Sequence, residues 1–126
     1  MEKKIITKNN VSVAVIHSDE IIIDDAQSAL DLIATIAYYD RCSRIAINKE
    51  AFAEEFFVLR TGLAGDILQK FANYAAKLAI IGDFSAYKSD ALKDFISESN
   101  RGNAIFFVPD EKQAVEKLTG VQPFLT

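Results

Sequence analysis

The residues of this chain that are best suited to binding chemistry are Arg60, Thr61 and Gly62, which open a helix predicted from the apolar spacing that follows them. The first turn of a helix presents backbone N–H groups and a partial positive charge, so it attracts anions, and Arg60 adds a full positive charge. A threonine at a helix start also has a simpler role, because its hydroxyl can accept a hydrogen bond from an orphan N–H, which is worth about 1 kcal/mol. The two roles are compatible, and we expect this helix start to dock a protein partner or a small anion.

Two other segments are expected to lie beside this helix start. Asn48 and Glu50 follow a predicted strand at 44–48, and Gly82 and Asp83 follow another at 78–81. Because the carboxyl ends of parallel strands meet at one edge of a sheet, positions 48, 61 and 83 are predicted to share a rim. The alternative is that Gly82 and Asp83 only turn the chain and that Arg60 is solvated. The predicted binding residues are Asn48, Glu50, Arg60, Thr61, Gly62 and Asp83.

No catalytic set can be assembled from the other reactive side chains. His17 is the only histidine, and Cys42 has no matched histidine, so it is typical of a small buried side chain. Glu54 and Glu55 are adjacent and therefore point in different directions on a helix or a strand. The stretch 62–65 lacks the glycine spacing and the lysine of a nucleotide-binding loop. We expect no cofactor and no metal, and we favour a non-enzymatic role.

Composition limits the class of protein further. With 126 residues, of which 50% are hydrophobic and 25% charged, the chain is predicted to form one domain over 1–126. A net charge of -4 without a basic cluster argues against nucleic acid as a partner. No apolar run approaches the roughly 18 residues that a membrane span requires. One cysteine agrees with a reducing compartment, so a cytoplasmic monomer or homodimer is expected.

Apolar periodicity predicts alternating strands and helices. The chain begins with a β-hairpin that turns at Asn9-Asn10, followed by a helix opened by Asp24-Asp25. A second long helix is predicted from near Thr61 to Ala76, with Ala75 among its inward residues. A third helix begins at Ser89 and ends at a left-handed Gly102, and a strand follows at 104–108. A last helix is capped by Asp110 and ended by Gly120.

This order of elements resembles the STAS or SpoIIAA-like fold, which is the scaffold of bacterial anti-sigma factor antagonists. The segments 61–71, 80–84 and 99–103 are similar to an uncharacterised bacterial family called domain of unknown function 4180. The resemblance covers nearly the whole chain. It implies an α/β fold with a mostly parallel five-stranded sheet, an N-terminal β-hairpin and about four helices.

The resemblance also implies a site of regulation. In anti-sigma factor antagonists the phosphorylated serine immediately precedes a glycine at the start of the second long helix, and Thr61-Gly62-Leu63 is similar. Thr61 is therefore a candidate phosphorylation site. Leu59 and Arg60 stand where that motif has Asp and Ser, so a kinase would meet a cation in place of an acid.

Two classes of function follow. The first is a regulatory binding module similar to STAS domains, which presents the start of the second long helix to a partner. The alternative is a small-ligand carrier or minor enzyme with a pocket between that helix and the aromatic link 49–60, which contains Phe52, Phe56 and Phe57. A deep pocket lined by these rings with convergent polar groups favours the ligand class, whereas a flat, partly apolar surface around Thr61 favours partner docking.

Overall fold

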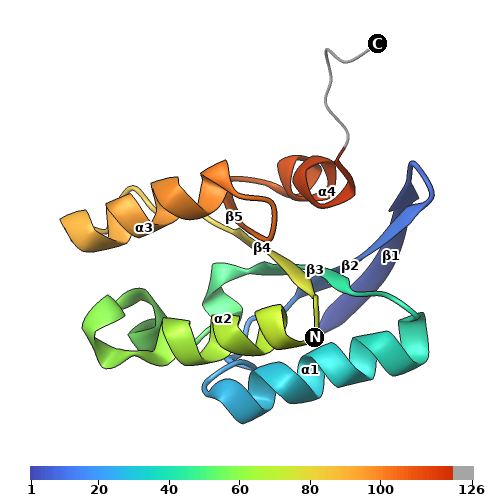
Figure 1. The fold of residues 1–126 in the computed structure, drawn as a ribbon, viewed down its shortest axis with the longest axis horizontal. Helices are drawn as coiled ribbons and strands as arrows, with labels where there is room; N and C mark the ends of the chain where they lie inside the picture. Colours follow the sequence, from blue (N-terminus) through green and yellow to red (C-terminus); the bar gives the residue numbers. More distant parts are fainter. Residues whose placement is uncertain (121–126) are drawn as a thin grey trace.

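A computed structural model describes residues 1–120 of the chain, in which five strands and four helices form one α/β unit (Figure 1). The strands are β1 (Glu2–Lys8), β2 (Val11–His17), β3 (Arg44–Asn48), β4 (Lys77–Ile81) and β5 (Ile105–Val108). The helices are α1 (Ala26–Asp40), α2 (Leu63–Asn73), α3 (Asp90–Arg101) and α4 (Glu111–Thr119). Three short 3₁₀ turns, η1 (Lys49–Ala51), η2 (Glu54–Phe57) and η3 (Leu59–Thr61), connect β3 to α2.

The strands form one sheet in the order β1-β2-β3-β4-β5. β1 and β2 are antiparallel, and the turn between them has Asn9 and Asn10 at φ 55° and 63°. Left-handed residues at both central positions match the twist of a two-residue hairpin, and asparagine tolerates them well. β2 to β5 run parallel to one another. The predicted fold class is therefore confirmed: a mostly parallel five-stranded sheet with an N-terminal hairpin.

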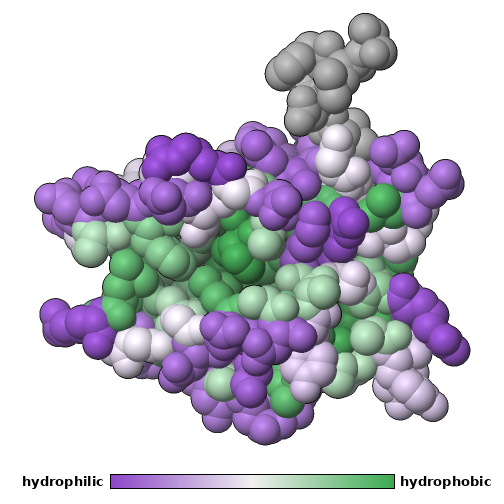
Figure 2. Space-filling model, viewed as in Figure 1, coloured by the Kyte–Doolittle hydropathy of each residue, from purple (hydrophilic) through white to green (hydrophobic). Residues whose placement is uncertain are grey.

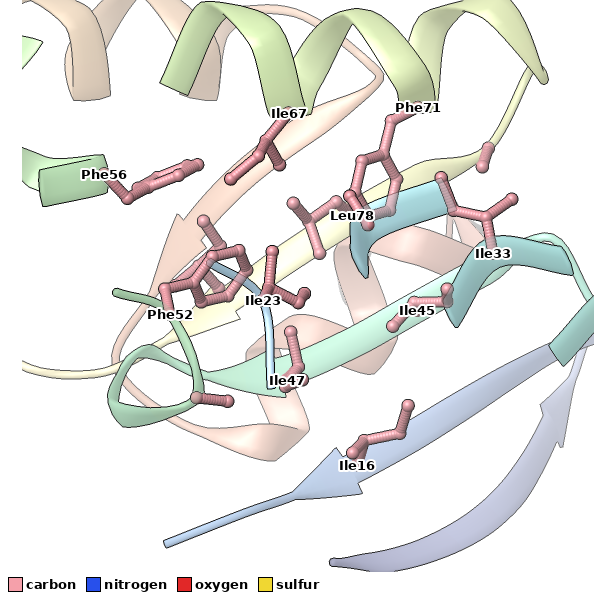
Figure 3. Packing of buried hydrophobic residues seen from close by; sticks show 14 of the residues in the cluster. Ile16, Ile23, Ile33, Ile45, Ile47, Phe52, Phe56, Ile67, Phe71 and Leu78 are labelled. Carbon is pink, nitrogen blue, oxygen red and sulfur yellow. The ribbon is translucent and has the colours of Figure 1, made fainter. Parts of the chain in front are cut away.

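The two faces of the sheet are covered by different helices. α1 and α2 lie side by side on one face, and α4 covers the other (Figure 1). Figure 2 shows that hydrophobic residues gather between these two helical layers, whose outer surfaces are mostly hydrophilic. Because successive strand residues point to opposite faces, Ile45 and Ile47 of β3 belong to the cluster with α1 and α2, while Ala46 belongs to the cluster with α4. Figure 3 shows Ile67 and Phe71 of α2 pointing toward the sheet. α3 packs against the edge strand β5.

Local capping signals in the sequence place three of the four helix starts. The side chains of Asp25, Ser89 and Asp110 each accept a hydrogen bond from the backbone N–H three residues later, at 2.7, 3.2 and 2.8 Å. Gly120 ends α4 with φ 73°, as predicted. Each of these caps satisfies a backbone group that the helix itself leaves without a partner.

The predicted bounds of α2 are wrong at both ends. The helix begins at Leu63, with Gly62 as its N-cap, because Thr61 ends a preceding 3₁₀ turn. It ends at Asn73, since Ala75 adopts a left-handed conformation with φ 53° and is exposed. The N–H groups of Ala75 and Ala76 donate to the carbonyl oxygens three and five residues earlier, at 3.1 and 2.8 Å, which is the Schellman pattern. Ala75 therefore stops the helix and does not face the core.

The predicted left-handed Gly102 is also wrong. Gly102 has φ -87° and ψ -162°, which is extended backbone. The cause lies just before it, where the amide of Asn100 accepts from the N–H of Phe107 at 2.7 Å and donates to the carbonyl of Phe107 at 3.1 Å. These two bonds hold the end of α3 against the edge strand β5, so the chain leaves the helix in the extended direction.

Within residues 1–120, no helix combines the length and the apolar character that crossing a bilayer requires.

Candidate functional site

The predicted docking residues at the start of α2 belong to a largely exposed segment, residues 58–62, which we call the α2 tip. The Thr61 hydroxyl lies within hydrogen-bond distance of the carbonyl oxygens of Glu55 and Val58, to which it donates at 2.9 and 2.8 Å, and it accepts from the N–H of Leu63 at 3.2 Å. The expected role of this hydroxyl in satisfying an orphan N–H of the helix is confirmed. The same bonds hold the tip against η2.

The outer surface of the α2 tip is open to solvent. Arg60, Thr61 and Gly62 are exposed, and the Val58 residue is 37% exposed. Gly62 has φ 80°, and a Cβ placed on it would meet no atom within 4 Å. The tip therefore exposes an apolar residue and a cation two positions apart in the sequence.

Asn48 has a different environment, because it is buried at the end of β3 with 7% exposure. Its Nδ2 donates to the carbonyl oxygen of Ser18 at 2.7 Å, and its Oδ1 accepts from the N–H of Ser18 at 2.9 Å. Nδ2 also donates to Oε1 of Glu50 at 3.2 Å. Both amide hydrogens and one acceptor position are used, so Asn48 ties the end of β2 to the end of β3 and orients Glu50.

The turn after β4 is held by its own hydrogen bonds. The N–H of Gly82 donates to the carbonyl of Val108 at 2.9 Å, and Oδ1 of Asp83 accepts from the N–H of Ser85 at 2.9 Å. Hydrogen bonding by the side chain and the backbone of Ser85 lowers the pKa of the Asp83 carboxyl. This is the turn chemistry that the alternative interpretation of Gly82 and Asp83 anticipated.

The structure brings some of the predicted rim residues together. Asn48 pairs with Ile81 in the sheet, so the ends of β3 and β4 are neighbours. The α2 tip reaches this edge through η2, where the ring of Phe57 lies 6.1 Å from that of Phe84. Within residues 1–120, no hydrogen bond or ion pair joins Arg60 or Thr61 to Asn48, Glu50 or Asp83. The tip and the strand ends are linked through aromatic packing.

A second feature at this edge was missed by the sequence analysis. An open cleft of about 280 Å³, which we call the Lys49 cleft, is lined by Ile21, Lys49, Glu50, Phe52, Glu54 and Tyr87. The Nζ of Lys49 lies 5.1 Å from the ring centroid of Tyr87 and 5.9 Å from that of Phe84. These residues come from three separate segments, so only the sheet register and the turns could have revealed their proximity.

The phenylalanine rings of the link 49–60, which were predicted to line a pocket beside α2, lie in the core cluster. Phe56 and Phe57 are only 1% and 3% exposed, and their ring centroids lie 5.0 Å apart within the core cluster. Phe52, with 2% exposure, contributes to the floor of the Lys49 cleft, which no residue of α2 lines. All three rings of the aromatic link are thus core residues, and Phe52 also borders the cleft.

The part of the chain that the structure describes contains no candidate metal-binding site. No cluster of three or more histidine, cysteine, aspartate or glutamate side chains is placed to hold an ion among residues 1–120. Cys42 is buried, and its thiol donates to the carbonyl oxygens of Ser12 and Arg44 at 3.1 and 3.2 Å.

Comparisons with known proteins give two similar solved structures and one family. Among solved structures, the anti-sigma factor antagonist SpoIIAA in its unphosphorylated form matches with 13% identity over 95% of this chain and 100% of that chain, at a TM-score of 0.44. The Bacillus cell fate determinant SpoIIAA in the phosphorylated form matches with 13% identity over 93% and 99% of the two chains, at a TM-score of 0.41. No curated protein matches. The family described as domain of unknown function (DUF4180) matches residues 8–118, and the chain belongs to this family.

Proposed function

We propose that this chain is a non-catalytic binding module that docks a protein partner through the α2 tip. The observation that carries the proposal is the exposed pair of Val58 and Arg60 on a tip that Thr61 fixes by hydrogen bonds. A fixed surface loses little conformational entropy on binding, which favours association. Arginine is a frequent energetic centre of protein interfaces, and an adjacent apolar side chain adds contact area.

The composition of the tip favours a protein partner over a free anion. Asp66 lies in the first turn of α2, where its negative charge opposes a small anion at the same helix end. A protein surface can place a carboxylate on Arg60 and an apolar side chain on Val58 at the same time. We therefore expect an acidic, partly apolar patch on the partner.

Phosphorylation of Thr61 is the proposed means of control. A phosphate in place of the hydroxyl removes the donor that now serves the carbonyls of Glu55 and Val58, and it adds about two negative charges beside Arg60. The tip would lose its fixed geometry and its positive character together. Release of an acidic partner is the expected consequence.

The test is affinity capture from a lysate of the cell of origin, with bound proteins quantified by mass spectrometry. Wild-type protein is compared with Arg60→Glu, Thr61→Glu and Lys93→Glu, where Lys93 is an exposed residue of α3 and its variant has the same charge change as Arg60→Glu. We expect at least one protein to be depleted about tenfold or more by both tip variants and retained by Lys93→Glu. Identical capture by all four proteins would contradict docking at the tip.

A further inference from the structure

Backbone hydrogen bonds join two of the segments that line the Lys49 cleft. The N–H groups of Ile22 and Ile23 both donate to the carbonyl of Ala51, at 2.8 and 3.0 Å, and the N–H of Ala53 donates to the carbonyl of Ile23 at 2.9 Å. Ile23 and Phe52 form a parallel bridge at the same place. The segments that carry Ile21 and Phe52 are thus joined by hydrogen bonds, and the cleft between them is a fixed feature of the fold.

One side of the cleft is aromatic and holds the Lys49 side chain. Its stem runs across Gly82, where a Cβ would lie only 2.7 Å from the Lys49 Cδ atom. The ammonium therefore lies against the rings of Tyr87 and Phe84 and forms no ion pair within residues 1–120. The cation–π contact keeps this positive charge on the aromatic wall.

The opposite charges in the cleft are also without ionic partners. Neither Glu50 nor Glu54 makes an ion pair in the described part of the chain, and Glu50 receives only the weakly bound amide of Asn48 at 3.2 Å. The lining contains these two glutamates and one lysine, so it carries a net negative charge. Burial, the negative charge of Glu54, a hydrogen bond to the Glu54 side chain and the charge of Glu50 raise the pKa of the Tyr87 phenol to about 12.

We propose that the Lys49 cleft binds an organic ammonium ion, with its charged head between the carboxylates of Glu50 and Glu54 and its alkyl part on Ile21. The Ile21 side chain, 57% exposed beside the charged groups, supplies the apolar contact that an alkylamine needs. The inference does not depend on docking at the α2 tip, because no tip residue lines the cleft.

A primary ammonium group can come from a free alkylamine or from a lysine side chain on a partner. The chemistry of the cleft is the same for both, so the probes are n-butylammonium and a short peptide with one lysine between glycine and serine residues. Their neutral counterparts are butan-1-ol and the same peptide with acetyl-lysine.

The experiment is a titration of the ¹⁵N-labelled full chain followed by amide chemical shifts, with each probe added to 20 mM. We expect saturable shifts at residues 21, 49–54 and 87 with at least one ammonium probe and none with its neutral counterpart. Shifts with n-butylammonium alone identify a free amine as the ligand, and stronger shifts with the lysine peptide identify a partner's lysine. Absence of saturable shifts with both, or equal shifts with the neutral probes, would overturn the proposal.

A matched pair of variants separates the cleft from general electrostatics. Glu54→Gln removes a carboxylate that lines the cleft, whereas Glu55→Gln removes its exposed neighbour, which does not line it. Affinity for the ammonium probe should fall about threefold to fivefold in Glu54→Gln and less than twofold in Glu55→Gln. Equal losses would show that the probe senses only net charge and would also overturn the proposal. Both variants keep the core intact, and a native spectrum of each confirms folding before titration.

Discussion

The packing of Lys49 across Gly82 makes a substitution at Gly82 a sensitive probe of the strand-end geometry. The backbone of Gly82 is not left-handed, so alanine meets no conformational strain there. The new Cβ would lie 2.7 Å from Cδ, 2.8 Å from Cγ and 3.2 Å from Cβ of Lys49. Because the near end of the lysine stem is involved, the whole side chain must leave the rings of Phe84 and Tyr87.

The expected cost follows from the contacts that are lost. A partly exposed cation–π contact contributes about 0.5–1 kcal/mol, and the displaced stem loses packing on the aromatic wall as well, so Gly82→Ala should destabilise the fold by about 1–2 kcal/mol. Gly65→Ala is the matched control. Gly65 lies inside α2 with no atom within 4 Å of its added Cβ, so alanine should stabilise the fold by about 0.5–1 kcal/mol. The two Gly→Ala changes are expected to have opposite signs.

Urea unfolding followed by circular dichroism measures both effects. Gly82→Ala should lower the midpoint by about 0.5–1 M, and Gly65→Ala should raise it. In a Lys49→Ala background the Cγ and Cδ atoms are absent, so more than half of the Gly82→Ala penalty should disappear. A neutral Gly82→Ala, or the same penalty in both backgrounds, would refute the proposed position of Lys49.

Three other predictions test separate parts of the structure. Ala75→Gly should stabilise the fold by about 0.5–1 kcal/mol in thermal or urea unfolding, because Ala75 occupies the left-handed position of a Schellman motif; destabilisation would contradict that conformation. Asn48→Asp removes the donor to Ser18 and should cost about 2–4 kcal/mol at pH 7, whereas the exposed control Asn103→Asp should change stability by less than about 0.5 kcal/mol. The pKa of Tyr87 is raised from 10.0 to about 12, so the folded state holds the phenol proton more tightly than the unfolded state, and this stabilisation is present below pH 10 and lost between pH 10 and 12. The difference in phenolate absorbance between wild type and Tyr87→Phe should show a transition near pH 12, and a transition near pH 10 would be the contrary result.

Local chemistry explains most of what the sequence predicted about the fold. The Asn9-Asn10 turn and the caps at Asp25, Ser89 and Asp110 depend on side chains that bond to backbone within a few residues. Such signals act over a short range, so periodicity and capping place the elements without knowledge of the tertiary structure.

The errors occur where tertiary contacts override local preference. Thr61 has the character of an N-cap, but the link 49–60 buries its phenylalanine rings in the core and folds into 3₁₀ turns. Thr61 ends the last of these turns, so Gly62 takes the cap position. Gly102 is extended because the amide of Asn100 bonds to Phe107 on another element. Neither contact is visible from neighbouring sequence.

The candidate site was predictable only in part for the same reason. The exposed start of α2 follows from the helix pattern, and the adjacency of the ends of β3 and β4 follows from parallel sheet topology. The burial of Asn48 depends on its bonds to Ser18, 30 positions earlier. The position of Lys49 depends on the missing side chain of Gly82, which only the strand register brings opposite it.

Site-specific photocrosslinking is the most direct test of partner docking at the α2 tip. A benzophenone side chain at position 58 is compared in the living cell with the same group at position 38, because Tyr38 is 74% exposed on α1 and makes a more accessible control than Val58, which is 37% exposed. Docking at the tip predicts a discrete cross-linked species from position 58 that disappears with Arg60→Glu and is not formed from position 38. No species from position 58, or the same species from both positions, would contradict it.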